Sequence, residues 1–331
     1  MRRTLRHVAD PGRPCKRRAA AHVCWERPEE PPLDLFYAQN LEDYHLAQAF
    51  ADRADGFYVD IGAGHPVADN VSFWFYLRGW RGLVVEPQRR LAELYRHVRP
   101  RDGVFAGLVA DRVGEAEFHE VESMHGFSTM LPDAAQAARD LGASVATVSV
   151  PVTTLAALLA EHRVEKVDFL KIDVEGAEAQ VLAGADWSRW RPRIIVLEAV
   201  APGSMAPAWE AWEPMLTGNG YRFGLFDGLN RFYVAEEEPE LAARLPQEKA
   251  DWGSVPHLWG AGRAPESPAH PDHALARALV DGFLARLPQL DRSLVADLLA
   301  AGGMSADMRS DAVAAALGRI ASRYDGGFPP D

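Results

Sequence analysis

The chain has 331 residues, 48% of them hydrophobic, and carries 35 Lys and Arg against 47 Asp and Glu, a net charge of −12. This length and apolar content allow one large globular domain with an appendage, while two cysteines, Cys15 and Cys24, are too few for a disulfide framework or a zinc finger. The acidity argues against binding nucleic-acid phosphates, so we expect a small or neutral polar substrate and no nucleic-acid partner.

The N-terminal arm, residues 1–33, differs from the rest in charge and in proline content. Residues 1–27 hold eight Lys and Arg and two acids. A twin arginine stands at Arg2 and Arg3, but no apolar core follows it, which argues against an export signal. We expect a disordered arm and a cytoplasmic protein without a membrane span.

Strands and helices alternate through the next part of the chain. Segment 34–50 has helical spacing, and a β-prone run then stops at Gly62-Ala63-Gly64. A strand that gives way to a helix at small residues is the first half of a βαβ unit. The pattern predicts strands at 57–61, 82–86 and 102–109, and helices at 34–50 and 88–98.

The alternation continues to residue 245. The uncharged run 141–160 contains Pro151 and several hydroxyl residues, so it predicts a strand followed by a helix start. Runs 167–173 and 193–198 are mostly apolar and end in acids, as strands of a parallel sheet do, and 221–234 predicts a closing hairpin. Residues 34–245 therefore predict a doubly wound, mostly parallel α/β sheet with its ligand site at the carboxyl ends of the strands.

The composition and the pattern of apolar residues change after residue 245. Residues 246–272 contain Pro265, Pro268 and Pro271 and predict a linker. Residues 273–331 predict a helical appendage, because apolar residues recur there at helical spacing: Leu275, Leu279, Phe283, Leu287, Val313, Leu317, Ile320 and Tyr324.

Acids follow the predicted strands at the edge where a doubly wound sheet binds its ligand. Acids also serve as ordinary helix caps, but three of these directly follow buried strands. The acids are Asp60, Glu86, Asp111, Asp173, Glu175 and Glu198.

The first glycine turn indicates which ligand is bound. A dinucleotide site needs a third glycine where Val67 stands, and the chain has no P-loop lysine. Asp60-x-Gly62-x-Gly64 instead places a carboxylate at the turn, which suits an ammonium and a sulfonium. Glu86, at the end of the next strand, can accept from both ribose hydroxyls. This pattern fits S-adenosylmethionine better than NAD.

Several strings resemble the FkbM family of S-adenosylmethionine-dependent methyltransferases. The most specific is K-I-D-V-E-G-A-E at 171–178, and others are V-D-I-G-A at 59–63, G-W-R-G at 79–82, Q-N-L-E-D at 39–43 and D-G-L-N-R-F-Y at 227–233. The resemblance covers about residues 36–245 and departs mildly from the family at Leu41. The last string looks like the branch found with glycan or polysaccharide biosynthesis.

The resemblance implies an O-methyltransferase on the class I (Rossmann-like) methyltransferase fold that uses S-adenosylmethionine to methylate a hydroxyl of a glycan, sugar or secondary metabolite. It also implies cofactor contacts. Asp60, Gly62 and Gly64 would face the methionine part, Glu86 the ribose, and Val109, Ala110 and Asp111 the adenine, with Gln39, Asn40 and Glu42 closing over the cofactor.

A hydroxyl acceptor calls for a base or a metal ion, because sugar hydroxyls are weak acids. The first candidates are Asp173, Glu175 and Glu198; a divalent ion, if one takes part, would be held by Asp173 and Glu198. His65 and His125 are alternative bases, and Lys171 is expected to pair with a neighbouring acid.

Two other functions stay open at this point. An NAD(P)-dependent sugar oxidoreductase or epimerase would need the missing third glycine and a Tyr-x-x-x-Lys pair. A non-catalytic α/β binding module would have little need of acids at every strand end. The acceptor, the metal requirement and the oligomeric state do not follow from the sequence.

Overall fold

The computed structural model describes residues 35–121, 128–130, 132–140, 142–201, 206–258, 264–268, 270, 272–302, 304 and 306–322. The predictions for the arm 1–33, for His125 and for Tyr324 lie outside these residues. No described helix is long and apolar enough to cross a membrane.

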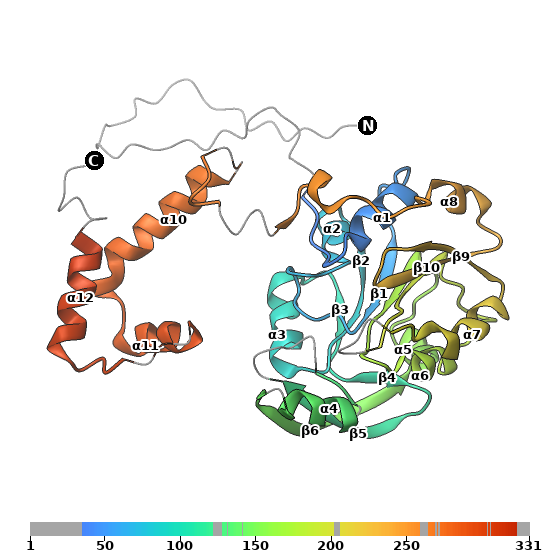
Figure 1. Ribbon diagram of the computed structural model, residues 1–331, viewed down its shortest axis with the longest axis horizontal. Helices are drawn as coiled ribbons and strands as arrows, with labels where there is room; N and C mark the ends of the chain where they lie inside the picture. The colour runs from blue at the N-terminus through green and yellow to red at the C-terminus, as the bar shows by residue number, and fades with distance from the viewer. Residues whose placement is uncertain are drawn as a thin grey trace, which may run out of the picture. The chain divides into compact units, whose positions relative to one another are not determined.

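Strands and helices alternate through residues 42–244, as predicted (Figure 1). The strands are β1 (Phe57–Ile61), β2 (Arg81–Val85), β3 (Gly103–Phe105), β4 (Leu108–Ala110), β5 (Gly114–Val121), β6 (Val145–Thr154), β7 (Phe169–Ile172), β8 (Ile194–Glu198), β9 (Tyr221–Phe226) and β10 (Asn230–Ala235). The helices of this part are α1 (Glu42–Ala49), α2 (Phe73–Leu77), α3 (Arg89–Val98), α4 (Pro132–Asp140), α5 (Leu155–Glu161), α6 (Glu178–Ala183), α7 (Glu213–Thr217) and α8 (Pro239–Arg244), with 3-10 turns η2 (Trp209–Ala211) and η3 (Trp252–Ser254).

Seven strands form one large sheet in the order β3-β2-β1-β7-β8-β10-β9. The pairs among β3, β2, β1, β7 and β8 are parallel, and β10 runs antiparallel to both β8 and β9. The predicted mostly parallel sheet and closing hairpin are therefore confirmed. The strand order reverses between β1 and β7, which is where open α/β sheets bind ligands.

Helices bury both faces of this sheet. On one face, α5, α6 and α7 supply Leu158, Val181 and Leu216 to a core with Val59, Leu170 and others. On the other face, α1, α2, α3 and α8 pack side chains against alternate positions of the same strands. Because both faces are covered, the parallel strands read as continuous apolar runs in the sequence.

A second sheet, of order β4-β6-β5, was not predicted. The sequence predicted one strand over 102–109, and this is wrong: β3 ends at Phe105, and β4 pairs instead with β6 through Leu108 and Val152. Gly107 permits the change of partner, since a Cβ there would lie 2.4 Å from the Pro151 carbonyl oxygen. This close approach depends on residues 44 positions apart, and local pattern does not reveal it.

The first helix starts later than predicted. The expected helix over 34–50 is observed only as α1 from Glu42, because Leu41 adopts a left-handed conformation with φ of 65°. The Asp43 carboxylate accepts hydrogen bonds from the Tyr37 and Ala38 N–H groups, at 2.6 and 3.3 Å. These bonds hold the preceding segment in a turn instead of a helix.

The C-terminal helices are α10 (His273–Arg286), α11 (Arg292–Ala301) and α12 (Asp311–Ser322), joined in part by η4 (Leu287–Gln289) and drawn in orange and red in Figure 1. Helices were predicted around α10 and α12, whereas α11 was not anticipated. Within the predicted linker, Leu258 N–H donates to the Phe36 carbonyl at 2.8 Å. Part of that segment is therefore paired with the α/β domain.

Candidate functional site

A cavity of about 490 Å³ lies at the carboxyl ends of β1, β2, β7 and β8. It falls at the reversal of strand order, where the sequence analysis placed the ligand. Its volume is within the range of small-molecule sites, about 300–1,000 Å³. Nine predicted site residues line it: Gln39, Gly62, Gly64, His65, Glu86, Val109, Asp173, Glu175 and Glu198.

The glycine turn after β1 forms one wall of the cavity. The Gly62 and Ala63 N–H groups both donate to the Val85 carbonyl at 3.0 Å, which ties the turn to β2. Gly62 has φ of 71°, and a Cβ there would lie 1.7 Å from the Asp173 carbonyl oxygen. Gly64 has φ of 61° with open space beside it, so a ligand can approach its backbone closely.

Glu86, directly after β2, faces this turn. Its side chain is 2% exposed, and its two carboxylate oxygens accept hydrogen bonds from Gly64 N–H and Gln88 N–H, each at 2.8 Å. Burial is the main cause that raises the Glu86 pKa to about 7. The carboxylate therefore connects the glycine turn to the end of β2 at the cavity wall.

Asp60 lies beneath the turn and is fully buried. One carboxylate oxygen accepts from Ser72 Oγ at 2.6 Å, and the other lies 3.6 Å from Lys171 Nζ. Lys171 also lies 3.3 Å from Asp173 and donates to the Gly62 carbonyl at 2.6 Å. The expected pairing of Lys171 with Asp173 is confirmed, and the lysine joins β7 to the turn after β1.

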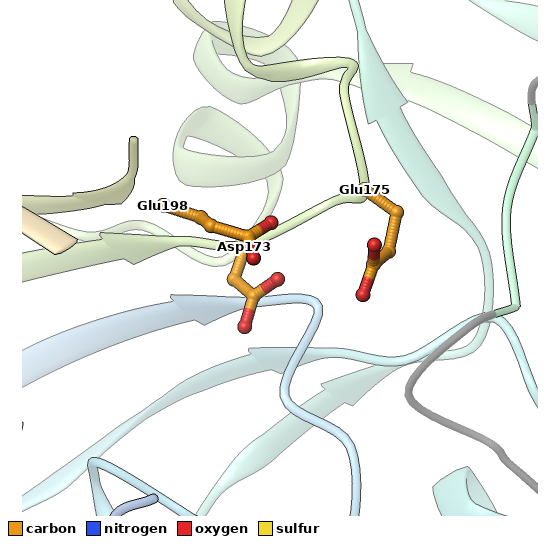
Figure 2. Close-up of side chains that lie close together, drawn as sticks. All are labelled: Asp173, Glu175 and Glu198. Atoms are coloured by element: carbon orange, nitrogen blue, oxygen red, sulfur yellow. The ribbon is translucent and has the colours of Figure 1, made fainter. Parts of the chain in front are cut away.

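Three carboxylates gather at the end of the cavity formed by β7 and β8. Asp173, Glu175 and Glu198 each offer an oxygen within 4.8 Å of the others, and all three are partly buried. Figure 2 shows the side chains converging from two segments of chain, the loop after β7 and the end of β8. A divalent cation with oxygen ligands fits such a group.

The electrostatics of this cluster favour a cation. Burial, followed by the charge of Asp173, raises the pKa of Glu175 to about 8 and that of Glu198 to about 10. One oxygen of Glu198 is buried and finds no hydrogen-bond partner among the described residues. Glu175 is held with φ of 54°, a strained conformation for a residue with a side chain. A positively charged ligand would relieve the repulsion between the three carboxylates.

The turn before α1 meets the hairpin of β9 and β10. Gln39 lines the cavity, whereas Asn40 Nδ2 donates to the Asp227 carbonyl at 3.0 Å and Glu42 accepts from Asn230 Nδ2 at 2.5 Å. Asn40 and Glu42 thus bind the hairpin, and Leu229 of that hairpin lines the cavity beside Gln39.

An apolar wall completes the cavity, and sequence reasoning missed all of its residues except Val109. It consists of Leu108 and Val109 of β4, Phe118 of β5, and Met130. Of the predicted adenine contacts, Val109 lies in this wall, Ala110 is buried at the end of β4, and Asp111 pairs with Arg112 at 3.5 Å. Alternation in β5 marks Phe118 as an inward residue but does not say what it faces.

Comparison with known proteins identifies the domain that contains this cavity. Residues 60–223 match the methyltransferase FkbM domain. This part of the chain belongs to the FkbM methyltransferase family. The matched range includes Glu86, Asp173, Glu175 and Glu198, so the FkbM resemblance predicted from the sequence is confirmed over it.

A curated relative agrees with the FkbM assignment over a short stretch. Methyltransferase sdnD of Sordaria araneosa is 42% identical over 52 residues, which cover 15% of this chain and 20% of that protein. The chain therefore spans about a fifth of the length of that relative. The FkbM family is one of methyltransferases, and this domain is a methyltransferase domain.

Proposed function

We propose that the chain is an S-adenosylmethionine-dependent O-methyltransferase that acts on a hydroxyl of a glycan, sugar or secondary metabolite. One observation carries the proposal: a single cavity joins a glycine turn, a buried glutamate, an apolar wall and three carboxylates at the point where the strand order reverses. The class I arrangement of the sheet is part of this proposal.

The residues present fit S-adenosylmethionine. The open space at Gly64 admits close approach of the methionine part, and Glu86 lies where it can accept from ribose hydroxyls. Phe118, Met130 and Leu108 offer an apolar surface to a purine. Lys171 is the one Lys or Arg among the described lining residues, which leaves an acidic cavity suited to a sulfonium and an ammonium.

The bound cofactor would supply a methyl group on a positively charged sulfur, already activated for displacement. The protein must then align the acceptor oxygen and take its proton. Within the cluster of Asp173, Glu175 and Glu198 we assign that proton to Asp173, because the raised pKa values of the two glutamates favour their protonated forms at neutral pH. The methyl group would pass to the acceptor oxygen, the sulfur would keep the electron pair of the broken carbon–sulfur bond, and a carboxylate of the cluster would accept the hydroxyl proton.

His65 is less suited to the base role. Its Nδ1 accepts from the Val67 and Ala68 N–H groups, at 3.2 and 3.0 Å. An imidazole whose Nδ1 accepts carries its proton on Nε2 when neutral, so Nδ1 is not free to take another. The carboxylates remain the base in this proposal, or they hold a divalent ion that lowers the pKa of the hydroxyl.

Calorimetry on the whole chain tests the cofactor. S-adenosylmethionine and S-adenosylhomocysteine should bind, and NAD should not. Binding of NAD alone would favour an oxidoreductase, and binding of none of the three would favour a non-catalytic module. Either result would overturn the proposal.

Two substitutions separate binding from chemistry. Glu86→Gln removes one anionic acceptor at the cavity wall and should weaken binding of S-adenosylhomocysteine by about 1–3 kcal/mol. Asp173→Asn should retain that binding and lose turnover with an acceptor panel. Glu93→Gln, on the exposed side of α3, is the control for both. A chelator that abolishes turnover of the unaltered protein, with recovery on adding Mg²⁺, would assign the cluster to a metal.

A further inference from the structure

Arg99, the residue that caps the C-terminus of α3, is completely buried although it carries a charge. Its guanidinium donates to Asp102 at 2.8 Å, and this ion pair has no exposed side-chain surface on either side. The rings of Tyr95, Tyr76 and Tyr58 surround it at 5.0, 5.2 and 5.5 Å. Asp102 in turn accepts from Tyr58 OH and from Gly82 N–H in β2.

One arm of this network leads from Arg99 to Asp60. Arg99 donates to Ser72 Oγ at 2.8 Å, and Ser72 donates to the Asp60 carboxylate at 2.6 Å. Asp60 is the residue of β1 that comes two positions before Gly62. The arm therefore ends directly below the glycine turn.

A second arm leads from Arg99 to the turn itself. Arg99 donates to Asn70 Oδ1 at 2.8 Å, and Asn70 Nδ2 donates to the Ala63 carbonyl at 2.9 Å. Tyr95 OH donates to the same carbonyl at 2.9 Å. Arg99 also donates to the Pro66 carbonyl at 3.4 Å, so it holds the loop that follows the turn as well.

A buried ion pair is weak evidence for stability, because removing both charges from water costs about as much as their attraction returns. Five donors in a rigid planar fork can, however, fix several acceptors at once, and the three donors of a lysine cannot reproduce that number or geometry. Arg99 donates in this geometry to Asp102, Tyr58, Asn70 and Ser72. Of these four residues, Asn70 and Ser72 connect Arg99 to the cavity wall.

We infer that Arg99 is a positioning residue for cofactor binding: through Ser72 and Asn70 it holds the 62–64 turn and the 65–72 loop in the conformation that the cofactor meets. In this role Asp60 supports the turn from below. The inference rests on the proposed function, since it needs a cofactor in the cavity formed by Gly62, Gly64 and Glu86.

The test compares cofactor affinity with stability. Arg99→Lys keeps a positive charge beside Asp102 but cannot donate to both Ser72 and Asn70, the first residues of the two arms. It should raise the dissociation constant of S-adenosylhomocysteine about tenfold or more. With an acceptor in hand, KM for the cofactor should rise while KM for the acceptor stays unchanged. Ser72→Ala and Tyr95→Phe, which each remove one hydrogen bond, should give smaller increases in the same constant.

Arg193→Lys is the matched control. Arg193 also bridges two acids, Asp168 and Glu238, but it precedes β8 and lies at the edge of the sheet opposite the cavity. The Arg193→Lys substitution should lower the melting temperature of the protein without changing its affinity for the cofactor. The inference is overturned if Arg99→Lys behaves like Arg193→Lys, or, should Arg99→Lys fail to fold, if neither Ser72→Ala nor Tyr95→Phe changes the affinity.

A readout without ligand separates this inference from the proposed function. Hydrogen exchange of residues 62–72 should be faster in Arg99→Lys than in the unaltered protein, and unchanged in Arg193→Lys. If the unaltered protein binds no S-adenosylhomocysteine, the proposed function fails while faster exchange still shows that Arg99 orders the turn. Unchanged exchange would remove the positioning role even if the cofactor binds.

Discussion

Four residues that line the cavity hold left-handed backbone conformations: Gly62, Gly64, Asp69 and Glu175, with φ of 71°, 61°, 53° and 54°. Such conformations cost a residue with a side chain about 1–2 kcal/mol. Glycine avoids that cost at two of the positions, whereas Glu175 bears it while its carboxylate lies beside Asp173 and Glu198. The strain at Glu175 therefore coincides with the group to which we assign the proton transfer.

The two glycines should respond differently to alanine. Gly62→Ala sets a Cβ against the Asp173 carbonyl oxygen and should lower the free energy of unfolding by about 3 kcal/mol. Gly64→Ala meets no atom within 4 Å and should cost about 1 kcal/mol, yet its methyl group narrows the cavity and should weaken binding of S-adenosylhomocysteine. Urea titration and calorimetry measure the two effects. Equal losses of stability would contradict the assigned geometry.

At the scale of elements, α5 shows how a local signal and a long-range contact combine. Thr154 ends β6 and caps α5, with its Oγ1 accepting from Ala157 N–H at 3.1 Å. The buried side chains Leu155, Leu158 and Leu159 then join the core below the large sheet. The predicted strand and helix start in 141–160 are confirmed, and the cap fixes where one becomes the other.

Thr154→Ala should lower the free energy of unfolding by about 1 kcal/mol, because Ala157 N–H loses its acceptor. Thr154→Ser keeps a hydroxyl at the cap and should retain most of that stability. Urea denaturation of the two variants beside the unaltered protein measures the difference. If serine is as damaging as alanine, packing of the threonine methyl group and not the cap explains the loss.

At the scale of the whole molecule, burial of carboxyl groups links stability to pH. Burial is the largest cause that raises the pKa of Glu42 and Glu175 to about 8 and of Asp43 and Glu86 to about 7. Carboxyl groups in an unfolded chain have pKa values of about 4. At pH values between the unfolded and the folded pKa values, the folded chain therefore holds more protons than the unfolded chain.

The free energy of unfolding should consequently fall as the pH rises from 7 to 9. The unfolded chain binds fewer protons than the folded chain in this range, so raising the pH favours the unfolded chain. Denaturation of the ligand-free protein at pH 7, 8 and 9 measures this. Glu175→Gln removes one of the titrating groups and should flatten the dependence. Stability that is constant or rises with pH would show that these carboxyls are already ionised in the folded protein.

The sequence by itself determined the strands of the large sheet other than β3, the closing hairpin and the acids at the strand ends. These features are local: an apolar run that ends at an acid or a glycine predicts a buried strand and its carboxyl end. The same information, joined to the resemblance, indicated the family and nine of the residues that line the cavity.

Only the tertiary structure decided which partners those residues have. Arg99 donates to Ser72, which in turn donates to Asp60. The strand β4 pairs with β6 instead of joining the large sheet, and the left-handed Leu41 makes the first helix begin later. Each of these results from contacts between segments that local pattern treats as independent. Asp60 shows the difference: its place after a strand is legible in the sequence, but its burial beneath the turn depends on how α3 and the 65–72 loop pack against it.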